Sequence, residues 1–226
     1  MIHELRGKYK GANIAVLGSG PTVNMYKEKE DLAIAVNGAA LIDRKYDIFM
    51  AGDFTSPTME WWETEASQRI MSSYISVFDP FMYPDKGTRT RLQDELDSHI
   101  AENKDEKYPY VGYYPQTRPK KPHLFFRFGG FGKEYVDFVS PNQVVMYWGG
   151  TISAIALQAS LVMGCESINI YGCGFNNQSG TNYHYDCPEG QGGSISDEQI
   201  RIMQATLDKV RSYGVHVKVH GESNIS

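Results

Sequence analysis

The chain has 226 residues, and 22 lysines and arginines against 27 aspartates and glutamates give it a formal net charge of −5. Its 41% hydrophobic and 22% charged residues are typical of a folded protein and exclude a largely disordered one. The acidic balance argues against nucleic acid as a partner, because neutralising phosphates requires a basic face. The sequence has no run of about 18 apolar residues and no apolar signal-peptide segment, so we expect a cytoplasmic protein without a membrane span.

Short apolar runs in the first quarter of the chain predict strands that are buried on both faces. They cover residues 13–17, 32–36 and 46–51, and each is followed by a glycine-containing turn. The links between them, 23–31 and 37–45, have room for short helices. Strands that alternate with helical links are typical of a parallel sheet covered on both faces.

The middle of the chain is less regular. A helix is predicted over 88–103, where apolar residues recur on one helical face, and a strand is predicted over 69–77. The surrounding sequence is rich in proline, tyrosine and phenylalanine. We therefore expect a single domain over 1–226, in which 55–146 forms an insertion, a lid or a homo-oligomer contact.

Regular patterns return in the last third of the chain. A helix rich in small residues follows 149–153 and is expected to end at Gly164. A strand is predicted over 167–171, a helix with an apolar stripe begins near Ser196, and a last strand covers 215–219. The whole pattern predicts an α/β fold with a mostly parallel sheet, helices on both faces and an irregular middle insertion.

The turn after the first predicted strand has the sequence Gly18-Ser19-Gly20-Pro21-Thr22. Glycines let backbone N–H groups approach a phosphate or a sugar, and the start of the next helix favours an anion. The turn is not the full dinucleotide-binding pattern, in which a third glycine would replace Val23. It is not a P-loop either, because no Gly-Lys-Ser/Thr follows. An ordinary strand-to-helix turn is the alternative interpretation.

Polar or glycine-rich positions also follow the other predicted strands. Asn37 follows the second strand, Asp53 the third, and Gly172-Cys173-Gly174 a later one. In an open parallel sheet, ligands bind beyond the carboxyl ends of the strands. We therefore expect Asn37 to bind a base or a ribose, and Asp53 to bind a ribose hydroxyl or a metal, with turn capping as the alternative for each.

Two further segments carry polar side chains that suit group transfer. Thr151 and Ser153 open the small-residue helix, where hydroxyls and amides suit a phosphate or a carboxylate, or only cap the helix. In the following loop, the imidazole of His184 titrates near neutral pH and can take a proton from an acceptor hydroxyl. Tyr183 beside it can hydrogen-bond a departing phosphate. A histidine on a surface loop is the alternative.

The cysteines suggest a metal site only weakly. Cys173, His184 and Cys187, with Cys165, offer soft ligands, but the chain has no Cys-x-x-Cys pair. An odd number of cysteines, three, does not make a disulfide framework. We therefore predict neither a metal site nor a nucleophilic cysteine.

The order of these motifs resembles one known group of proteins. The first glycine turn, Asn37, the Gly-Thr-Ile-Ser helix start, the Tyr-Gly-Cys-Gly-Phe strand end and the Tyr-His loop resemble the small bacterial sialyltransferases that use CMP-sialic acid. They are also similar to a wider Rossmann-like family that includes flagellin glycosyltransferases and the archaeal 6-hydroxymethyl-dihydropterin pyrophosphokinase. The resemblance covers roughly 12–54 and 147–220, and 55–146 has no match.

The resemblance implies a Rossmann-like fold and a metal-independent, inverting transfer of a sugar from a CMP-linked donor, without a cofactor. The acceptor would be a hydroxyl of a glycan or of another molecule. The nucleotide phosphate would lie along the first glycine turn, and Asn37 would hold the nucleotide or the donor sugar. Thr151 and Ser153 would contact the donor's phosphate or carboxylate. Tyr183 would stabilise the leaving phosphate, and His184 would be the general base.

This chain departs from the sialyltransferase pattern near the expected reaction centre. Those enzymes have Asp where this chain has Gly174, Tyr where it has Asn176, and Asn where it has Asp53. The residues expected to bind the nucleotide therefore match better than those expected to catalyse transfer. Gly172, Gly174 and Asn176 stay candidates for donor binding.

Two other functions fit the same motifs. One is an ATP-dependent pyrophosphokinase of the pterin type, which would need magnesium held by Asp53 and by Asp79 or Asp186. The other is a non-catalytic nucleotide-binding protein, which the departures at Gly174 and Asn176 favour.

Overall fold

The computed structural model describes residues 2–52, 61, 64, 66–72, 123–126, 128–131, 133–148, 150–175 and 195–226. The helix predicted over 88–103 lies outside the described residues. So do four of the predicted site residues: Asp53, Asn176, Tyr183 and His184.

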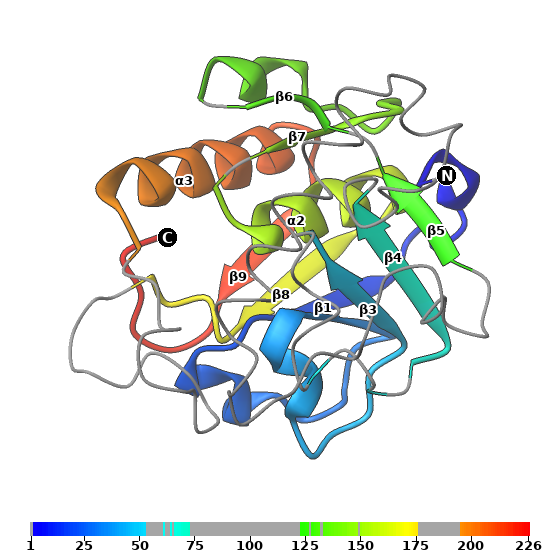
Figure 1. Ribbon diagram of the computed structural model, residues 1–226, viewed down its shortest axis with the longest axis vertical. Helices are drawn as coiled ribbons and strands as arrows, with labels where there is room; N and C mark the ends of the chain where they lie inside the picture. Colours follow the sequence, from blue (N-terminus) through cyan, green and yellow to red (C-terminus); the bar gives the residue numbers. More distant parts are fainter. Residues whose placement is uncertain are drawn as a thin grey trace, which may run out of the picture.

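A seven-stranded sheet forms the centre of the fold, in the order β5-β4-β3-β2-β1-β8-β9 (Figure 1). Every neighbouring pair of strands in it is parallel. Its strands are β1 (Asn13–Leu17), β2 (Leu32–Val36), β3 (Ile48–Ala51), β4 (Gln68–Ser72), β5 (His123–Phe126), β8 (Ser167–Tyr171) and β9 (His216–Val219). The predicted α/β fold with a mostly parallel sheet is confirmed.

The apolar runs locate several strands accurately. β1, β2 and β8 have the bounds predicted from the sequence. β3 begins at Ile48 instead of residue 46, and Asp47 lies at the amino end of the sheet. There the Asp47 carboxylate accepts a hydrogen bond from the Ala33 N–H at 2.9 Å. A side chain that directly precedes β3 therefore holds the start of β2.

The two faces of the sheet are covered by different kinds of helix (Figure 1). One face carries α2 (Ile152–Met163), α3 (Asp197–Arg211) and the short 3-10 helix η1 (Ile2–Leu5). The other carries the 3-10 helices η2 (Pro21–Met25) and η3 (Asn37–Leu41), which occupy the short links between β1, β2 and β3. The predicted coverage of both faces is confirmed, and the short links hold one turn or two of 3-10 helix each.

Alternating side chains of the central strands serve two separate cores. In β1, Ile14 and Val16 belong to the core shared with α2 and α3, whereas Ala15 and Leu17 belong to the core shared with η2 and η3. All four side chains are fully buried. This double burial explains why the strand has a continuous apolar run instead of an alternating pattern.

The two long helices end and begin as their sequences predict. Gly164 follows α2 with a φ of 84°, a left-handed conformation that glycine adopts without strain. Ser196 caps α3 through a capping box, in which its hydroxyl accepts from the Gln199 N–H and the Gln199 side chain binds the Ser196 backbone. α2 is buried over its whole length, which accounts for its small residues.

The described part of the 55–146 region extends the fold in two places. β4 and β5 add two strands to one edge of the main sheet. β6 (Phe128–Phe131) and β7 (Met146–Trp148) form a second, two-stranded parallel sheet, with η7 (Lys133–Phe138) between them. This region therefore contributes structure to the main sheet as well as beside it.

A buried glutamine of α2 anchors β7. Gln158 is 1% exposed, and its Oε1 accepts hydrogen bonds from the Tyr147 N–H at 2.9 Å and from Gln143 Nε2 at 3.0 Å. Its Nε2 donates to the Tyr147 carbonyl at 2.7 Å. Gln158 thus satisfies both backbone groups of Tyr147, as a neighbouring strand would.

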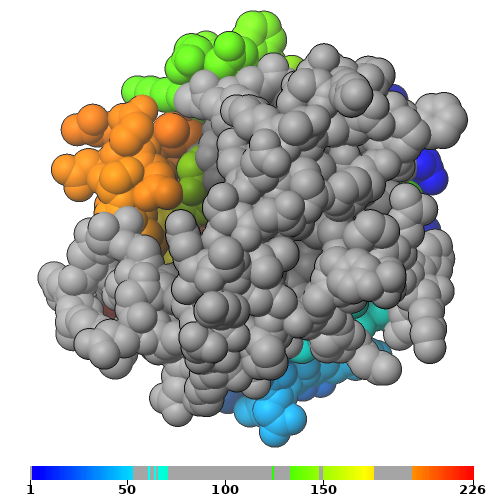
Figure 2. Space-filling view, viewed as in Figure 1, coloured from blue at the N-terminus to red at the C-terminus, as the bar shows by residue number. Residues whose placement is uncertain are grey.

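Exposed apolar side chains lie near α3 and η7. Phe138 is 61% exposed, Val144 54% and Tyr213 44%. Figure 2 shows α3 in orange and the segment around η7 in green, both at the surface. The Tyr213 hydroxyl donates to the Val139 carbonyl at 3.1 Å and joins the two segments. Exposed aromatic residues are enriched in interfaces, so a homo-oligomer stays a prediction. In the described ranges, none of the helices has the length and apolar character needed to cross a membrane.

Candidate functional site

The order of the strands reverses direction at one place in the sheet. From β1 the chain continues outward through β2, β3, β4 and β5, and on the other side of β1 lie β8 and β9. In open α/β sheets, ligands bind at such a switch point, in the crevice outside the carboxyl ends of the strands. The turns that follow β1 and β8 are the glycine turns singled out in the sequence. The topology therefore brings Gly18–Thr22 and Gly172–Phe175 together at the expected position.

The two glycine turns contact each other directly. The Gly18 N–H donates to the Tyr171 carbonyl at 2.7 Å, and the Gly20 N–H donates to the Gly172 carbonyl at 2.8 Å. A Cβ on Gly20 would lie 2.7 Å from the Gly172 carbonyl oxygen, and one on Gly18 would overlap Cys173 Sγ. Glycine is therefore required because the two turns approach closely. The amides of Gly18 and Gly20 bind the neighbouring turn and do not point to a ligand.

Other amides of the same turns have no acceptor among the residues that the structure describes. Within the described ranges, the N–H groups of Ser19, Thr22, Gly174 and Phe175 make no hydrogen bond. A backbone donor without a protein partner requires water or a ligand. The switch point thus presents unpaired amide donors from both turns, which is the arrangement that binds phosphate oxygens.

Asn37 supplies an acceptor that has no donor within the described ranges. It follows β2, and the pairing of Leu17 with Ala35 places the carboxyl ends of β1 and β2 side by side. Its backbone has a φ of 47°, a left-handed conformation that asparagine tolerates. Its Oδ1 atom is buried and finds no hydrogen-bond donor in the described part of the chain. A buried acceptor without a donor costs about 1–3 kcal/mol, so a donor from a ligand or from beyond the described residues would stabilise this site.

The start of α2 packs against the second glycine turn. Thr151 caps the helix, and its hydroxyl accepts from the Ala154 N–H at 3.3 Å. Ser153 is 6% exposed, and its hydroxyl oxygen lies 3.2 Å from Cys173 Sγ. Capping therefore occupies the hydroxyl of Thr151, and contact with Cys173 occupies that of Ser153. The positive end of the α2 dipole is close to the switch point.

The start of α3 lies near the start of α2. Gln199 Nε2 donates to the Gly150 carbonyl at 2.7 Å. Both helices lead back to strands of a parallel sheet, so both begin at its carboxyl edge. Their N-terminal dipoles add favourably for an anion bound there.

The cysteines that the structure describes are buried thiols. Cys165 and Cys173 are both free. Burial raises the pKa of Cys173 to about 11, and burial raises that of Cys165 to about 12. Both thiols are therefore protonated at neutral pH and are poor nucleophiles. Cys187 and His184, the other candidate soft ligands, lie outside the described residues. Among the residues that are described, no group of three or more His, Cys, Asp or Glu side chains could hold a metal ion.

One segment of the site is not predicted by the sequence patterns. Residues 220–225, after β9, contact both glycine turns. A Cβ on Gly221 would overlap the Thr22 side chain. Ser223 and Asn224 hydrogen-bond the carbonyls of the turn after β8. A glycine two residues after the last strand, followed by polar residues, is the one signal in the sequence that could have indicated this segment.

His220 begins this segment and lies on the sheet face that carries η2. Its ring stacks on Tyr171, with centroids 4.2 Å apart and planes 13° apart. Its Nε2 lies 2.9 Å from Asn169 Oδ1. The Tyr171 hydroxyl in turn donates to Glu30 Oε1 at 2.8 Å. Burial lowers the pKa of His220, the charge of Lys218 lowers it further, and Glu30 opposes both effects.

The lowered pKa of His220 predicts a loss of stability in mild acid. The unfolded chain binds the proton more readily than the folded one, so this contribution is fully present above the ordinary pKa of 6.5 and is lost as the pH falls below it. We expect the free energy of unfolding, measured by urea denaturation between about pH 7.5 and 5.5, to fall less steeply in His220→Gln than in the wild type. His216→Gln, at an exposed histidine of the preceding strand β9, is the matched control. If the free energy of unfolding falls equally steeply with pH in His220→Gln and in the wild type, the prediction is wrong.

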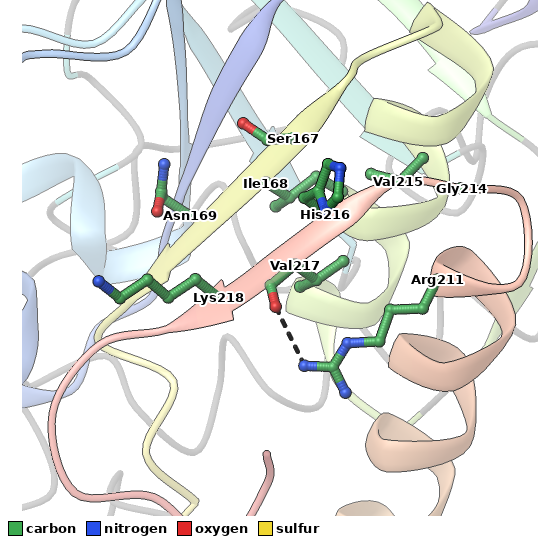
Figure 3. Close-up of a pocket in the computed structure, with 9 residues that line it drawn as sticks. All are labelled: Ser167, Ile168, Asn169, Arg211, Gly214, Val215, His216, Val217 and Lys218. Atoms are coloured by element: carbon green, nitrogen blue, oxygen red, sulfur yellow. Dashed lines mark hydrogen bonds between the residues drawn. The ribbon is translucent and has the colours of Figure 1, made fainter.

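A separate shallow pocket lies along β8 and β9 (Figure 3). Its volume is about 480 Å³, and its lining includes Asn169, Arg211 and Lys218. The Arg211 guanidinium is held by the Val217 carbonyl at 3.1 Å and by Asp208 at 3.5 Å. None of the predicted site residues lines this pocket. The switch point is therefore the stronger candidate site.

Comparison with models of known protein families gives no match for this chain, and no curated protein matches it.

Proposed function

We propose that the chain is a glycosyltransferase that binds a nucleotide-activated sugar, most simply a CMP-sialic acid-like donor, at the switch point between β1 and β8. The observation that carries the proposal is the buried Oδ1 of Asn37, which has no donor within the described ranges and follows the strand that pairs with β1. The amino group of a cytosine or a ribose hydroxyl can donate to this oxygen. The oxygens of the nucleotide phosphate can accept from the unpaired amides of the two turns. One ligand would thus satisfy acceptor and donors together.

The proposed reaction needs positioning and charge stabilisation, and it proceeds without a metal. His184 would take the proton of the acceptor hydroxyl. The hydroxyl oxygen would bond to the anomeric carbon from the face opposite the nucleotide, which inverts the configuration. The bond from that carbon to the phosphate oxygen would break, and CMP would leave with Tyr183 donating to its phosphate. These two roles derive from the resemblance to the sialyltransferases.

Thermal denaturation with a panel of nucleotides tests the proposal. We expect CMP to raise the melting temperature of the wild type more than CDP, UDP, GDP or ATP with magnesium. A ligand at 100 times its Kd stabilises by about 2.7 kcal/mol, which corresponds to several degrees. In Asn37→Gly the CMP shift should disappear. Its ligand-free stability should stay about unchanged, because glycine accommodates the φ of 47° and removes the unpaired oxygen.

The controls separate binding from catalysis. Glu28→Gly replaces another residue with a positive φ, 56°, and should keep the CMP shift. His184→Ala should keep the CMP shift but lose sugar transfer. Stabilisation by ATP and magnesium alone would favour the pyrophosphokinase and contradict the proposal. No shift with any nucleotide would contradict it as well. Binding of CMP without any sugar transfer would support the alternative of a non-catalytic nucleotide-binding protein.

A further inference from the structure

The 220–225 segment passes along the carboxyl edge of the sheet next to β8. Figure 1 shows it in red, curving beside the yellow stretch that directly follows β8. Gly221 packs against Thr22 in the turn after β1. At the far end Ile225 is 3% exposed, in the core shared with α2 and α3. The segment is thus anchored on both sides of the switch point.

The middle of the segment holds both carbonyls at the end of the second glycine turn. Ser223 Oγ donates to the Gly174 carbonyl at 3.0 Å, and the Asn224 N–H donates to the same oxygen at 2.9 Å. Asn224 Nδ2 donates to the Phe175 carbonyl at 2.7 Å. These hydrogen bonds fix the orientation of the peptide planes at Gly174 and Phe175.

Fixing a carbonyl also fixes the amide of the same peptide. In a trans peptide, the C=O and the N–H point in opposite directions. Because the Gly174 carbonyl is directed toward Ser223 and Asn224, the Phe175 N–H is directed away from them. This N–H has no acceptor within the described ranges. The 220–225 segment therefore fixes the orientation of a donor that has no acceptor within the described ranges.

The turn would not take this shape by its own preference. Phe175 has a φ of 50°, which bulky residues rarely adopt. Such a conformation persists only where the surroundings impose it, and it is concentrated at ligand sites. The Phe175 side chain is 5% exposed in the core, and Asn224 holds its carbonyl. The side chain and the carbonyl of Phe175 are therefore both held by contacts outside the turn.

We infer that Ser223 and Asn224 are positioning residues of the nucleotide site, which hold the Phe175 amide in place to donate to an anionic oxygen of the ligand. The inference rests on the proposed function. Neither side chain needs to touch the nucleotide, because both act through the turn after β8. Their loss should therefore weaken binding more than it weakens the fold.

Isothermal titration with CMP tests this inference. The double variant Ser223→Ala/Asn224→Ala should bind CMP about tenfold more weakly than the wild type, since a hydrogen bond to a charged group is lost. Ser223→Thr keeps the hydroxyl and should keep the wild-type affinity. Ser212→Ala is the matched control, because the Ser212 hydroxyl also donates to a backbone carbonyl, that of Lys209 at 2.7 Å, away from the switch point.

The outcomes distinguish this inference from the proposed function. If the wild type binds CMP and the double variant binds it equally well, the positioning role is wrong and the proposed function stands. If the wild type binds no nucleotide, both are wrong. If the double variant fails to fold, the NMR amide resonance of Phe175 in the wild type tests the inference instead. We expect it to move downfield when CMP is added, and an unmoved resonance would overturn the inference.

Discussion

Gly172→Ala is expected to destabilise the folded protein by about 4 kcal/mol and to abolish nucleotide binding. Gly172 has a φ of 69°, and a Cβ there would overlap the carbonyl oxygen of Gly18. The obstacle is backbone, so no side chain can rotate away and the two glycine turns must separate. Separation breaks the bond from the Gly20 N–H to the Gly172 carbonyl and the bond from the Gly172 N–H to Thr22 Oγ1. Urea denaturation measures the loss.

Gly214→Ala is the matched control for this prediction. Gly214 has a φ of 83°, but a Cβ there would have no neighbour within 4 Å. It should therefore cost only the left-handed conformation, about 1–2 kcal/mol. The difference between the two variants isolates the overlap between the turns. Equal destabilisation would mean that the turns are not in contact.

The sequence predicts the central strands because a strand that is buried on both faces has a continuous apolar run, which is a local feature of the sequence. Val16 and Ile34, for example, lie within such runs and are fully buried. The end of α2 at Gly164 and the cap of α3 at Ser196 are local in the same sense. Such features require only the short-range preferences of the chain.

Which backbone amides of the glycine turns make hydrogen bonds within the protein could not be predicted in this way. The sequence indicates that Gly18 and Gly20 lie in a turn that can approach a phosphate. Their amides bind the turn after β8 instead, because β8 returns to pair with β1 across a separation of more than a hundred residues. Which amides stay unpaired depends on this non-local pairing, and so does the buried oxygen of Asn37. The 220–225 segment was missed for the same reason.

Long-range hydrogen bonds also decide how the second sheet is attached. The apolar and small residues around Gln158 indicate a buried helix, but they do not indicate which groups the Gln158 amide binds. In the structure it lies between α2 and β7 and binds both backbone groups of Tyr147. A buried amide in this position links the 55–146 region to the helix whose first turn packs against the glycine turn.

Gln158→Leu is therefore expected to destabilise the protein by about 3 kcal/mol, although leucine suits a buried site. The substitution removes the side chain that binds the Tyr147 N–H and the Tyr147 carbonyl, and it leaves Gln143 Nε2 with only its contact to Met146 Sδ. Gln204→Leu is the matched control. It also removes hydrogen bonds to a backbone N–H, a carbonyl and a side chain, but these are exposed and water replaces them. We expect the control to cost about 1 kcal/mol or less in urea denaturation. The two variants lose similar hydrogen bonds, which differ in their access to water. An equal loss in the free energy of unfolding would therefore contradict the stabilising effect of burial at Gln158.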